Sequence, residues 1–557
     1  MPTNQQIADQ FGLLAKLMDI HQENSFKAKS YAAAAFAIER LPAELSEMER
    51  STIPHLKGIG ASSAQKIMEL LDGGQLQLLD DLLGKTPAGI LEMMQIKGLG
   101  PKKIATIWKE MEIETIGELL YACTENRLLR YKGFGEKTQK NVSSSIEFFL
   151  RHKGHFLWAE LETYVQRMEQ VVQERFPDYT MESCGSFKRQ LPTLDALEWA
   201  TNIPTVQLLP FLQELECEIT SRQDAYISAK GLESVELRFY HSASTSTAVT
   251  AFRQNCSESF LHAWNEQFHH QWESVVSESE IFSSCSVPFI PSFLREDPSI
   301  IDQVLSQPTV SVIQPHDIKG IIHSHSDWSD GANTIEEMAV VCQQLGMEYL
   351  VISDHSKSAF YANGLQEERV KSQHQYIDEL NRKLSPFVIF KSIECDILND
   401  GVLDYSDALL STFDLVIASV HSNLNMDQDK AMHRLLRAIE HPATTILGHP
   451  TGRLLLSRKG YPIDHEKIID ACISNRVAIE INAHPRRLDL DWSWVAKAQE
   501  KGAMLSINPD AHVIEGFKDV RYGVLAAQKG GLQKTHNLSS LNLNAFQQYL
   551  KENRKIK

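Results

Sequence analysis

The chain has 557 residues, of which 43% are hydrophobic and 23% are charged, and its formal net charge is −17. This length predicts three or more packed units, and the lack of any apolar run of about 18 residues excludes a bilayer-spanning helix. The acidic balance weighs against a general nucleic-acid binder, because such affinity comes from neutralising phosphates, but it allows local binding through backbone amides and a few lysines.

The eight cysteines are scattered without a CxxC pair, and the start of the chain lacks the charged region and apolar centre of a signal peptide. These features predict reduced, mostly buried thiols in a cytoplasmic protein. We expect no membrane contact, and the sequence leaves the oligomeric state open, a monomer included.

The first 150 residues have the periodicity of helices, and a short motif occurs three times among them. LKGIG (56–60), IKGLG (96–100) and YKGFG (131–135) each precede a helix-forming segment. The motif resembles the helix-hairpin-helix module, in which glycines permit a tight turn and the next helix presents amides to a DNA phosphate. One copy would fit an ordinary helical hairpin, but three favour DNA binding. The residues expected to contact DNA are Gly58, Gly60, Gly98, Gly100, Lys102, Lys103, Gly133, Gly135 and Lys137.

The middle of the chain is harder to interpret. Residues 155–240 mix helical patterns with strand-like runs such as SVELRF, and residues 240–310 have no clear periodicity. The proline-containing segments PFIPSFLREDPSI and SQPTVSVIQPHD predict a linker to the last part of the chain.

From Ile318 onward, seven short apolar strands alternate with helices, which predicts an α/β barrel. Histidines and carboxylates follow these strands, where the loops of barrel enzymes form the active face. His323 and His325 are two residues apart, so an extended segment would point both in the same direction. The nine candidate ligands are His323, His325, Asp330, His355, Glu394, His421, His449, Asp510 and His512.

These nine side chains could hold three divalent ions and leave positions for water and substrate. Mixed nitrogen and oxygen ligands suit Mn, Zn or Fe, and closely spaced ions favour in-line displacement at phosphorus. One strand-end histidine is more often a core or loop residue than a ligand. The same chemistry after seven strands predicts a multinuclear phosphoesterase site.

The motifs HSHSDWSDG, SDHS, IECDI, SVHSN, GHPTGRLL, EINAHPRRLDL and NPDAH resemble those of the polymerase and histidinol phosphatase (PHP) domain. The similarity is to the version appended to bacterial family X DNA polymerases, and it covers about 318–557. It implies a distorted seven-stranded barrel, a trinuclear site formed by the nine residues, and manganese-dependent 3′–5′ exonuclease and 3′-end-cleaning activity on DNA.

Three further residues lie in these motifs. The resemblance implies that Arg453 and Arg487 bind substrate phosphates, although solvated surface arginines would also fit the sequence. Asp354 points away from His355 along the strand, so we expect it to support the site rather than to bind metal.

The family resemblance continues through residues 155–310, but the polymerase residues change. CGSFKRQLPTLDALEWA contains Gly185 and Ser186 of a nucleotide-binding signature that normally leads into Asp-x-Asp. Ala196 and Glu198 occupy those aspartate positions, and Glu236 aligns with the third aspartate. Octahedral magnesium tolerates little change in ligand length, and alanine cannot ligate it. We therefore expect no Mg at this site and predict a scaffold that has lost nucleotidyl transfer.

The predicted architecture is multidomain α/β. It comprises an N-terminal helical DNA-binding domain with the first hairpin (1–90), a fingers-like helix-hairpin-helix region (91–150), a degenerate α+β palm and thumb (151–310) and a distorted (β/α)7 PHP barrel (311–557).

The favoured function is a metal-dependent DNA 3′–5′ exonuclease or 3′-end phosphodiesterase in DNA repair. The alternatives are an active family X repair polymerase with a proofreading PHP nuclease, a small-molecule phosphatase of the histidinol-phosphatase type, and a non-catalytic DNA-binding scaffold. The hairpins argue against the phosphatase, because a small soluble substrate needs no DNA clamp.

Overall fold

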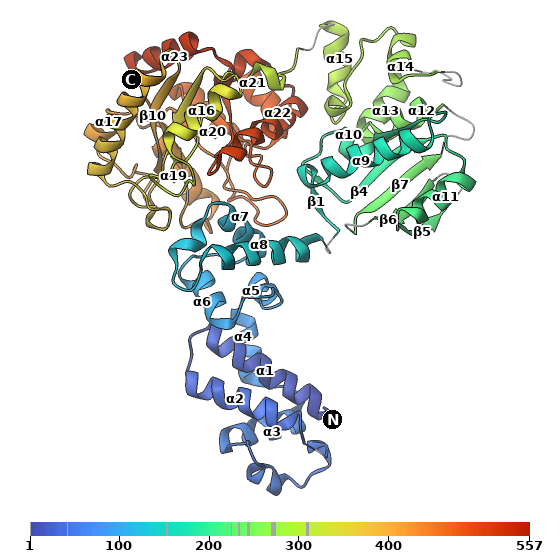
Figure 1. The fold of residues 1–557 in the computed structure, drawn as a ribbon, viewed down its shortest axis with the longest axis vertical. Helices are drawn as coiled ribbons and strands as arrows, with labels where there is room; N and C mark the ends of the chain where they lie inside the picture. Colours follow the sequence, from blue (N-terminus) through green and yellow to red (C-terminus); the bar gives the residue numbers. More distant parts are fainter. Residues whose placement is uncertain are drawn as a thin grey trace. The chain divides into compact units, whose positions relative to one another are not determined.

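The computed structural model divides the chain into two compact units, Met1–Glu147 and Phe148–Lys557 (Figure 1). The residues that it describes are 2–41, 43–151, 154–223, 226–231, 234–241, 246–268, 275–307 and 311–556. None of the helices in these ranges is long and apolar enough to cross a membrane. The division lies close to the boundary predicted at residue 150, and the other predicted boundaries stay predictions.

The first unit is helical, as predicted. Its α-helices are α1 (Asn4–Ile20), α2 (Ser25–Ile38), α3 (Ala61–Gly73), α4 (Gln77–Lys85), α5 (Ala88–Met93), α6 (Pro101–Lys109), α7 (Ile116–Thr124) and α8 (Glu136–Arg151), which continues past the unit boundary. A capping box at Thr3 begins α1, because the Thr3 hydroxyl accepts the Gln6 amide and the Gln6 side chain returns to the Thr3 amide. Phe11 and Tyr31 pack edge to face between α1 and α2.

The second unit begins with a five-stranded mixed sheet in the order β2-β4-β7-β6-β5. Its strands are β2 (Met181–Cys184), β4 (Ala196–Thr201), β5 (Glu218–Arg222), β6 (Tyr226–Lys230) and β7 (Glu236–His241), and β4 and β7 are parallel. The short strands β1 (Phe156–Leu157) and β3 (Thr193–Leu194) pair beside it. Its helices are α9 (Trp158–Arg175), α10 (Gly185–Lys188), α11 (Thr205–Glu214), α12 (Thr247–Gln254), α13 (Glu258–Gln267), α14 (Glu278–Ser284) and α15 (Ser299–Ser306).

The linker predicted from the proline-containing segments is wrong for residues 288–300. Ile290 and Leu294 are buried in one apolar cluster with Ile300 on α15. The prolines Pro291 and Pro298 directly precede short helices, where their fixed φ and missing amide hydrogen are tolerated. They begin helices of a packed core. Residues 308–310 of the second segment lie outside the described residues.

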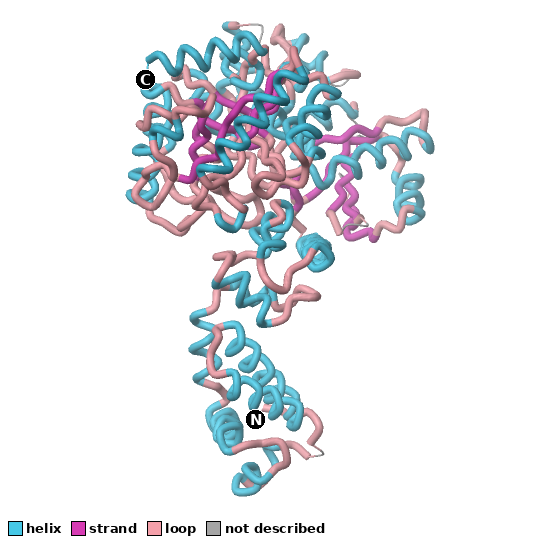
Figure 2. The backbone as a smooth tube through the Cα atoms, turned by 60° about the vertical axis from the view of Figure 1, so that its left-hand side comes forward, coloured by secondary structure: helices cyan, strands magenta, loops and turns pink. Residues whose placement is uncertain are grey.

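The predicted seven-stranded α/β architecture is confirmed. All strands are parallel and neighbours follow chain order from β8 to β14. In Figure 2, magenta strands lie inside this part of the chain with helices around them. They are β8 (Gly320–Ile321), β9 (Tyr349–Ile352), β10 (Val388–Asp396), β11 (Leu415–Ser419), β12 (Ile446–Leu447), β13 (Ala478–Asn482) and β14 (Leu505–Asn508). The two outer strands meet through a bridge between Ser324 and Ala511 and a 2.9 Å hydrogen bond from the His325 amide to the Ala511 carbonyl. The sheet therefore curls into a near-barrel.

Helices cover the barrel and close one end of it. They are α16 (Ile335–Gln344), α17 (Glu367–Leu384), α18 (Asp407–Leu410), α19 (Gln428–Ile439), α20 (His465–Asn475), α21 (Val495–Glu500), α22 (Val520–Lys529) and α23 (Leu543–Ile556). Phe546 of α23 stacks on Tyr349, the first residue of β9, with ring centroids 4.5 Å apart. This apolar plug fills the barrel where strands begin, which leaves the strand ends for a polar site.

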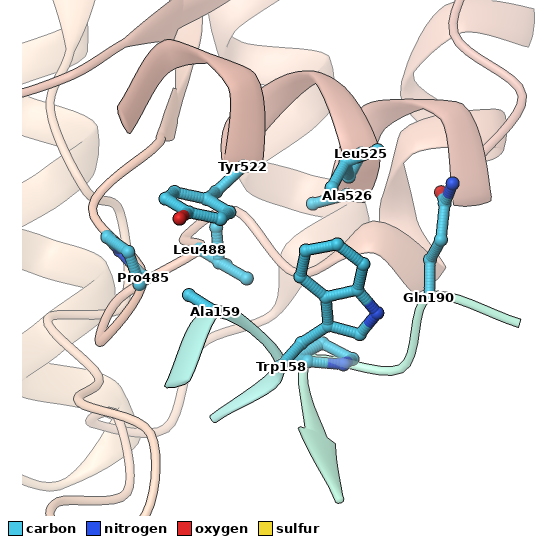
Figure 3. A pocket seen from close by; sticks show the side chains of 9 residues that line it. Trp158, Ala159, Gln190, Pro485, Leu488, Tyr522, Leu525 and Ala526 are labelled. Atoms are coloured by element: carbon cyan, nitrogen blue, oxygen red, sulfur yellow. The ribbon is translucent and has the colours of Figure 1, made fainter. Parts of the chain in front are cut away.

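The five-stranded sheet region and the barrel contact each other within the second unit. Figure 3 shows Trp158 and Ala159 facing Leu488, Tyr522 and Ala526 around a small pocket. Ion pairs flank this apolar contact: Arg486 lies 3.0 Å from Glu160, and Arg521 pairs with Glu162. The segment that follows β13 is thus held by side chains from outside the barrel.

Candidate metal centre

The polar site lies where the seven parallel strands end, because that edge brings distant loops together. His323 and His325 follow β8, His355 follows β9, Glu394 lies in β10, His421 follows β11, His449 follows β12, and Asp510 and His512 follow β14. Asp330 comes from the loop after β8. Eight of the nine side chains are buried and His421 is nearly so. The structure therefore brings all nine sequence-predicted residues to one place.

Ligand atoms within this cluster fall into three overlapping groups whose members lie within 4.8 Å of one another. The groups are His325, Asp330, His355 and His512; His323, His325, Glu394 and Asp510; and His355, Glu394 and His421. The groups share His325, His355 and Glu394, which fits a site for more than one metal ion, and the number of ions stays a prediction. His449 lies beside these groups, with its Nε2 2.9 Å from Oε1 of the shared residue Glu394.

Glu394 is the shared carboxylate of the cluster. Imidazole nitrogens of five histidines lie within 3.6 Å of its two oxygens: His323, His325, His355, His421 and His449. Some of these atoms face one another without hydrogen-bond geometry, as His355 Nδ1 and Glu394 Oε2 do at 3.0 Å. Buried polar atoms are rarely left in this way, and a cation between them would satisfy both. The donor set therefore fits divalent metal ions of the Mn, Zn or Fe type.

Burial and charge act in opposite directions on the ionisation of this cluster. Burial disfavours the charged form of His323, but the carboxylates of Glu480 and Asp510 outweigh it and raise the His323 pKa well above its ordinary value. Burial and the neighbouring His512 lower the pKa of His325 to about 4. Burial alone would raise the pKa of Glu394, but the surrounding imidazoles hold it well below its usual range. The site thus keeps its carboxylates ionised.

A second layer of polar residues orients the candidate ligands, and sequence reasoning missed it. Glu480 accepts from His323 Nδ1 at 2.6 Å and from the His449 amide at 2.6 Å. Asp396 lies 2.8 Å from His421 Nδ1. Such partners fix the tautomer and direction of a metal-binding imidazole. The sequence does carry a signal for these two residues, because each is a carboxylate within an otherwise apolar strand, as in VAIEINAH and SIECDI.

The backbone at His323 differs from the extended segment expected for the pair with His325. His323 has φ +64°, Asp510 has φ +53°, and β8 ends before both histidines. Non-glycine residues in this left-handed region cost free energy and cluster at functional sites. The two imidazoles converge because of this turn, and not through the alternation of a strand.

The supporting residues take different places. Asp354 accepts hydrogen bonds from the Ser326 amide and from the side chains of Ser329 and Gln373, so it fixes the loop that carries Asp330. Arg487 Nε lies 3.8 Å from Asp510 Oδ2, at the cluster.

Arg453 is held by the protein itself. Its Nε donates to the Arg487 carbonyl at 3.0 Å, and its other nitrogens bond Asp491 and the Leu488 carbonyl. These contacts support neither a substrate contact of Arg453 nor a solvated surface position for it. Its guanidinium fixes the segment that presents Arg487.

The polymerase-like positions do not form a comparable cluster. Ala196 and Glu236 are register partners on the parallel strands β4 and β7. Glu198 accepts from the Ser186 amide and the Tyr240 hydroxyl, both at 3.0 Å, and Glu236 pairs with Arg238 at 2.9 Å. Among the described residues, no group of three metal-type ligands occurs at this sheet.

The three glycine motifs have one local geometry. Gly58, Gly98 and Gly133 have φ between +89° and +95°, a conformation that favours glycine. Gly60 and Gly100 directly precede α3 and α6, and Gly135 precedes α8. Lys102 and Lys137 are exposed, and so are three further lysines inside the motifs, Lys57, Lys97 and Lys132. Lys103 is half-buried and donates to the Gly98 carbonyl at 3.2 Å.

Comparison with known proteins agrees with this geometry. Residues 2–76 match the helix-hairpin-helix domain, residues 90–146 the SAM-like helix-hairpin-helix tandem, and residues 322–484 the PHP domain. These matches define a class of protein in which helix-hairpin-helix modules accompany a PHP domain.

The relatives identify the family more closely. The chain is 32% identical over 97% of its length to the "DNA polymerase/3′-5′ exonuclease PolX" of Bacillus subtilis, of which 98% is covered. It is 26% identical over 42% of its length to a "probable phosphatase" of Thermoanaerobacter sp. (94% covered), and 26% identical over 34% to the "probable phosphatase YcdX" of Escherichia coli (77% covered). The chain belongs to the PolX family of DNA polymerase/3′-5′ exonucleases.

Proposed function

We propose that this protein is a metal-dependent DNA 3′–5′ exonuclease or 3′-end phosphodiesterase that acts in DNA repair, with the barrel as its catalytic centre. The carrying observation is the convergence of nine histidines and carboxylates on one site, with five imidazoles around Glu394. The match to a PHP domain and the full-length PolX relative support a DNA substrate.

In this proposal the nine residues hold three divalent ions, which supply positive charge to the phosphodiester and lower the pKa of water. The chain's own groups prepare the site. Glu480 and Asp396 hold His323 and His421 in the tautomer that presents the other ring nitrogen. Arg487, beside Asp510, is placed to receive a substrate phosphate.

The helix-hairpin-helix motifs would hold the DNA backbone. Their positive-φ glycines precede helices whose first amides have no partner within the helix, and such amides bind phosphate. The exposed lysines of the motifs add local positive charge to an acidic chain. We assign residues 1–90 and 91–150 to this task, 151–310 to positioning DNA, and 311–557 to hydrolysis.

Nucleotidyl transfer is the point on which two candidate functions differ. The full-length relative is named a DNA polymerase as well as an exonuclease, which supports the active-polymerase alternative better than a loss of synthesis. The side chains support loss, because Ala196 offers no ligand and Glu198 is bonded to protein donors. A small-molecule phosphatase receives less support, since the phosphatase relatives match less than half of the chain.

The test incubates 3′-recessed duplex DNA with Mn²⁺, with and without nucleotides, and compares the wild type with His421→Ala. Shortening by the wild type that is lost in His421→Ala supports the nuclease. Extension, measured again in the His421→Ala background so that degradation cannot hide it, would establish the polymerase alternative. Inertness toward DNA with rapid hydrolysis of small phosphomonoesters would overturn the DNA substrate.

A further inference from the structure

One large apolar side chain stands out on the surface of the barrel. Phe360, in the short helix η6 (Phe360–Ala362), is 75% exposed, whereas the next most exposed large apolar residue of the described barrel, Leu456, is 41% exposed. Single exposed apolar residues are common and by themselves indicate nothing. Phe360 differs from such residues in two ways: it lies near the metal centre, and the segment that carries it is held by hydrogen bonds.

Phe360 lies on a short path of rings that leads from the solvent to the metal centre. Its ring packs edge to face on Tyr361 with centroids 5.8 Å apart, and the Tyr361 ring lies 6.5 Å from that of His355. His355 is one of the candidate ligands around Glu394. An apolar face is thus presented at the rim of the site.

The segment that carries these rings is firmly held at both ends. The Ser358 amide donates to Asp404 at 2.7 Å, and the Ser358 hydroxyl donates to Asp396, the carboxylate that also orients His421. After the rings, Asn363 Nδ2 donates to the Trp328 carbonyl at 3.1 Å. A Cβ at Gly364 would lie 1.9 Å from the Ser356 carbonyl oxygen, so the backbone approach there is close. The exposure of Phe360 is therefore built into a braced turn.

We propose that Phe360 and Tyr361 form a stacking platform for the terminal nucleobase of a DNA 3′ end whose phosphodiester enters the metal centre. The inference rests on the proposed function and specifies its substrate. Aromatic side chains stack on every base, so they bind single-stranded ends without reading sequence. Stacking also adds affinity that needs no positive charge, which suits a chain of net charge −17.

Kinetics with Mn²⁺ test the platform in the full-length protein. Phe360→Ala should raise KM for a single-stranded oligonucleotide about tenfold, as loss of one stacked base implies. Its kcat should stay within about twofold of the wild type, because in this proposal Phe360 provides only uniform binding of the substrate. Phe360→Trp should restore the wild-type KM, and Phe360→Leu should not.

The matched control is Leu345→Ala, which removes another exposed apolar side chain of the barrel, at the end of α16, and should leave KM unchanged. A second comparison uses an oligonucleotide whose 3′ residue is abasic. For that substrate Phe360→Ala should have the same KM as the wild type, since no base is present to stack. An equal loss on abasic and normal ends would overturn the platform.

A binding measurement separates this inference from the proposed function. In EDTA, 2-aminopurine at the 3′ end should be quenched on binding to the wild type, and the quenching should be lost with Phe360→Ala and kept with Leu345→Ala. Equal quenching by wild type and Phe360→Ala would overturn the platform even if the protein degrades DNA. If the wild type degrades no DNA, the proposed function fails, whatever the fluorescence shows.

Discussion

The barrel and the five-stranded sheet both carry acidic side chains on their strands, but these acids have opposite surroundings. In the barrel, Glu394 is buried among five imidazoles, and some facing atoms do not form hydrogen bonds. In the sheet, Glu198 accepts from the Ser186 amide and the Tyr240 hydroxyl, and Glu236 pairs with Arg238. Ala196 offers no ligand atom at all.

This difference shows that two properties help to identify a candidate metal centre: the number of carboxylates, and whether their oxygens lack hydrogen-bond donors from the protein. An acid whose oxygens already accept protein donors gains little from a cation, since the cation would first have to displace those donors. In Glu394, Oε1 lies within hydrogen-bond distance of His421 and His449, but the buried Oε2 faces imidazoles without a hydrogen bond, and a cation would satisfy that oxygen. On this comparison, we predict that the nuclease depends on the acids of the barrel and not on those of the sheet.

The largest expected effect separates the two regions directly. Glu394→Gln should lower exonuclease activity by more than about 100-fold and release bound metal, because loss of a shared ligand exceeds the 10- to 100-fold cost of losing an outer partner. Mass spectrometry of bound metal and a 3′-labelled DNA assay measure both quantities. Glu198→Gln is the control and should change neither. A nuclease that depends on Glu198 would break the comparison.

An intermediate effect tests whether the outer carboxylates matter. Asp396 lies 2.8 Å from His421 Nδ1. Asp396→Asn should keep a hydrogen-bond partner there but remove the charge that favours the metal-binding tautomer of His421. Metal affinity should therefore fall about 10-fold to 100-fold. Titration of the metal-free variant with Mn²⁺, followed by exonuclease activity, measures the loss. Asp400→Asn, a change at an exposed carboxylate beyond β10, is the matched control. Equal metal affinity of Asp396→Asn and the wild type would contradict this prediction.

The smallest effect concerns a barrel carboxylate away from the imidazoles. Burial raises the pKa of Asp519 to about 7, the opposite of the shift at Glu394. The folded state then retains a proton that the unfolded chain releases near pH 4, so stability is lost as pH rises from the unfolded pKa towards 7.

Asp519→Asn should therefore be more stable than the wild type at pH 8 by about 1 kcal/mol, after allowance for its partial exposure, and nearly equal at pH 4. Thermal unfolding of both proteins across this pH range measures the difference. If the difference in stability between Asp519→Asn and the wild type does not grow with pH, the pKa of Asp519 is not raised. The predicted contrast between Asp519 and Glu394 would then be wrong.

Much of the candidate site could be predicted because its determinants are local in the sequence. The strands around the ligands are apolar runs ended by His, Asp or Glu, and parallel strands in a barrel must end at one edge. The glycine motifs were equally visible, since positive φ restricts Gly58, Gly98 and Gly133 largely to glycine. Whether the nine residues bind metal stays a prediction.

Other features could not be predicted because they depend on contacts between distant segments. Glu480 reads as one polar residue in an apolar strand, and only the fold places it 2.6 Å from His323, far away in sequence. The prolines of residues 288–300 indicated a linker, but Ile290 and Ile300 of this segment pack in a buried apolar cluster. Periodicity carries no information on which surface an apolar side chain will meet.

The sequence by itself thus determined which chemical groups this protein has and along which strands and turns they lie, since local propensity and spacing decide both. Only the tertiary structure decided which carboxylates remain available to bind a metal ion. Glu394 and Glu198 look alike in the sequence, but the donors around Glu198 come from α10 and β7, while five imidazoles from four strand ends surround Glu394. Ionisation and metal affinity follow from such neighbours, because burial and nearby charge set the free energy of a carboxylate.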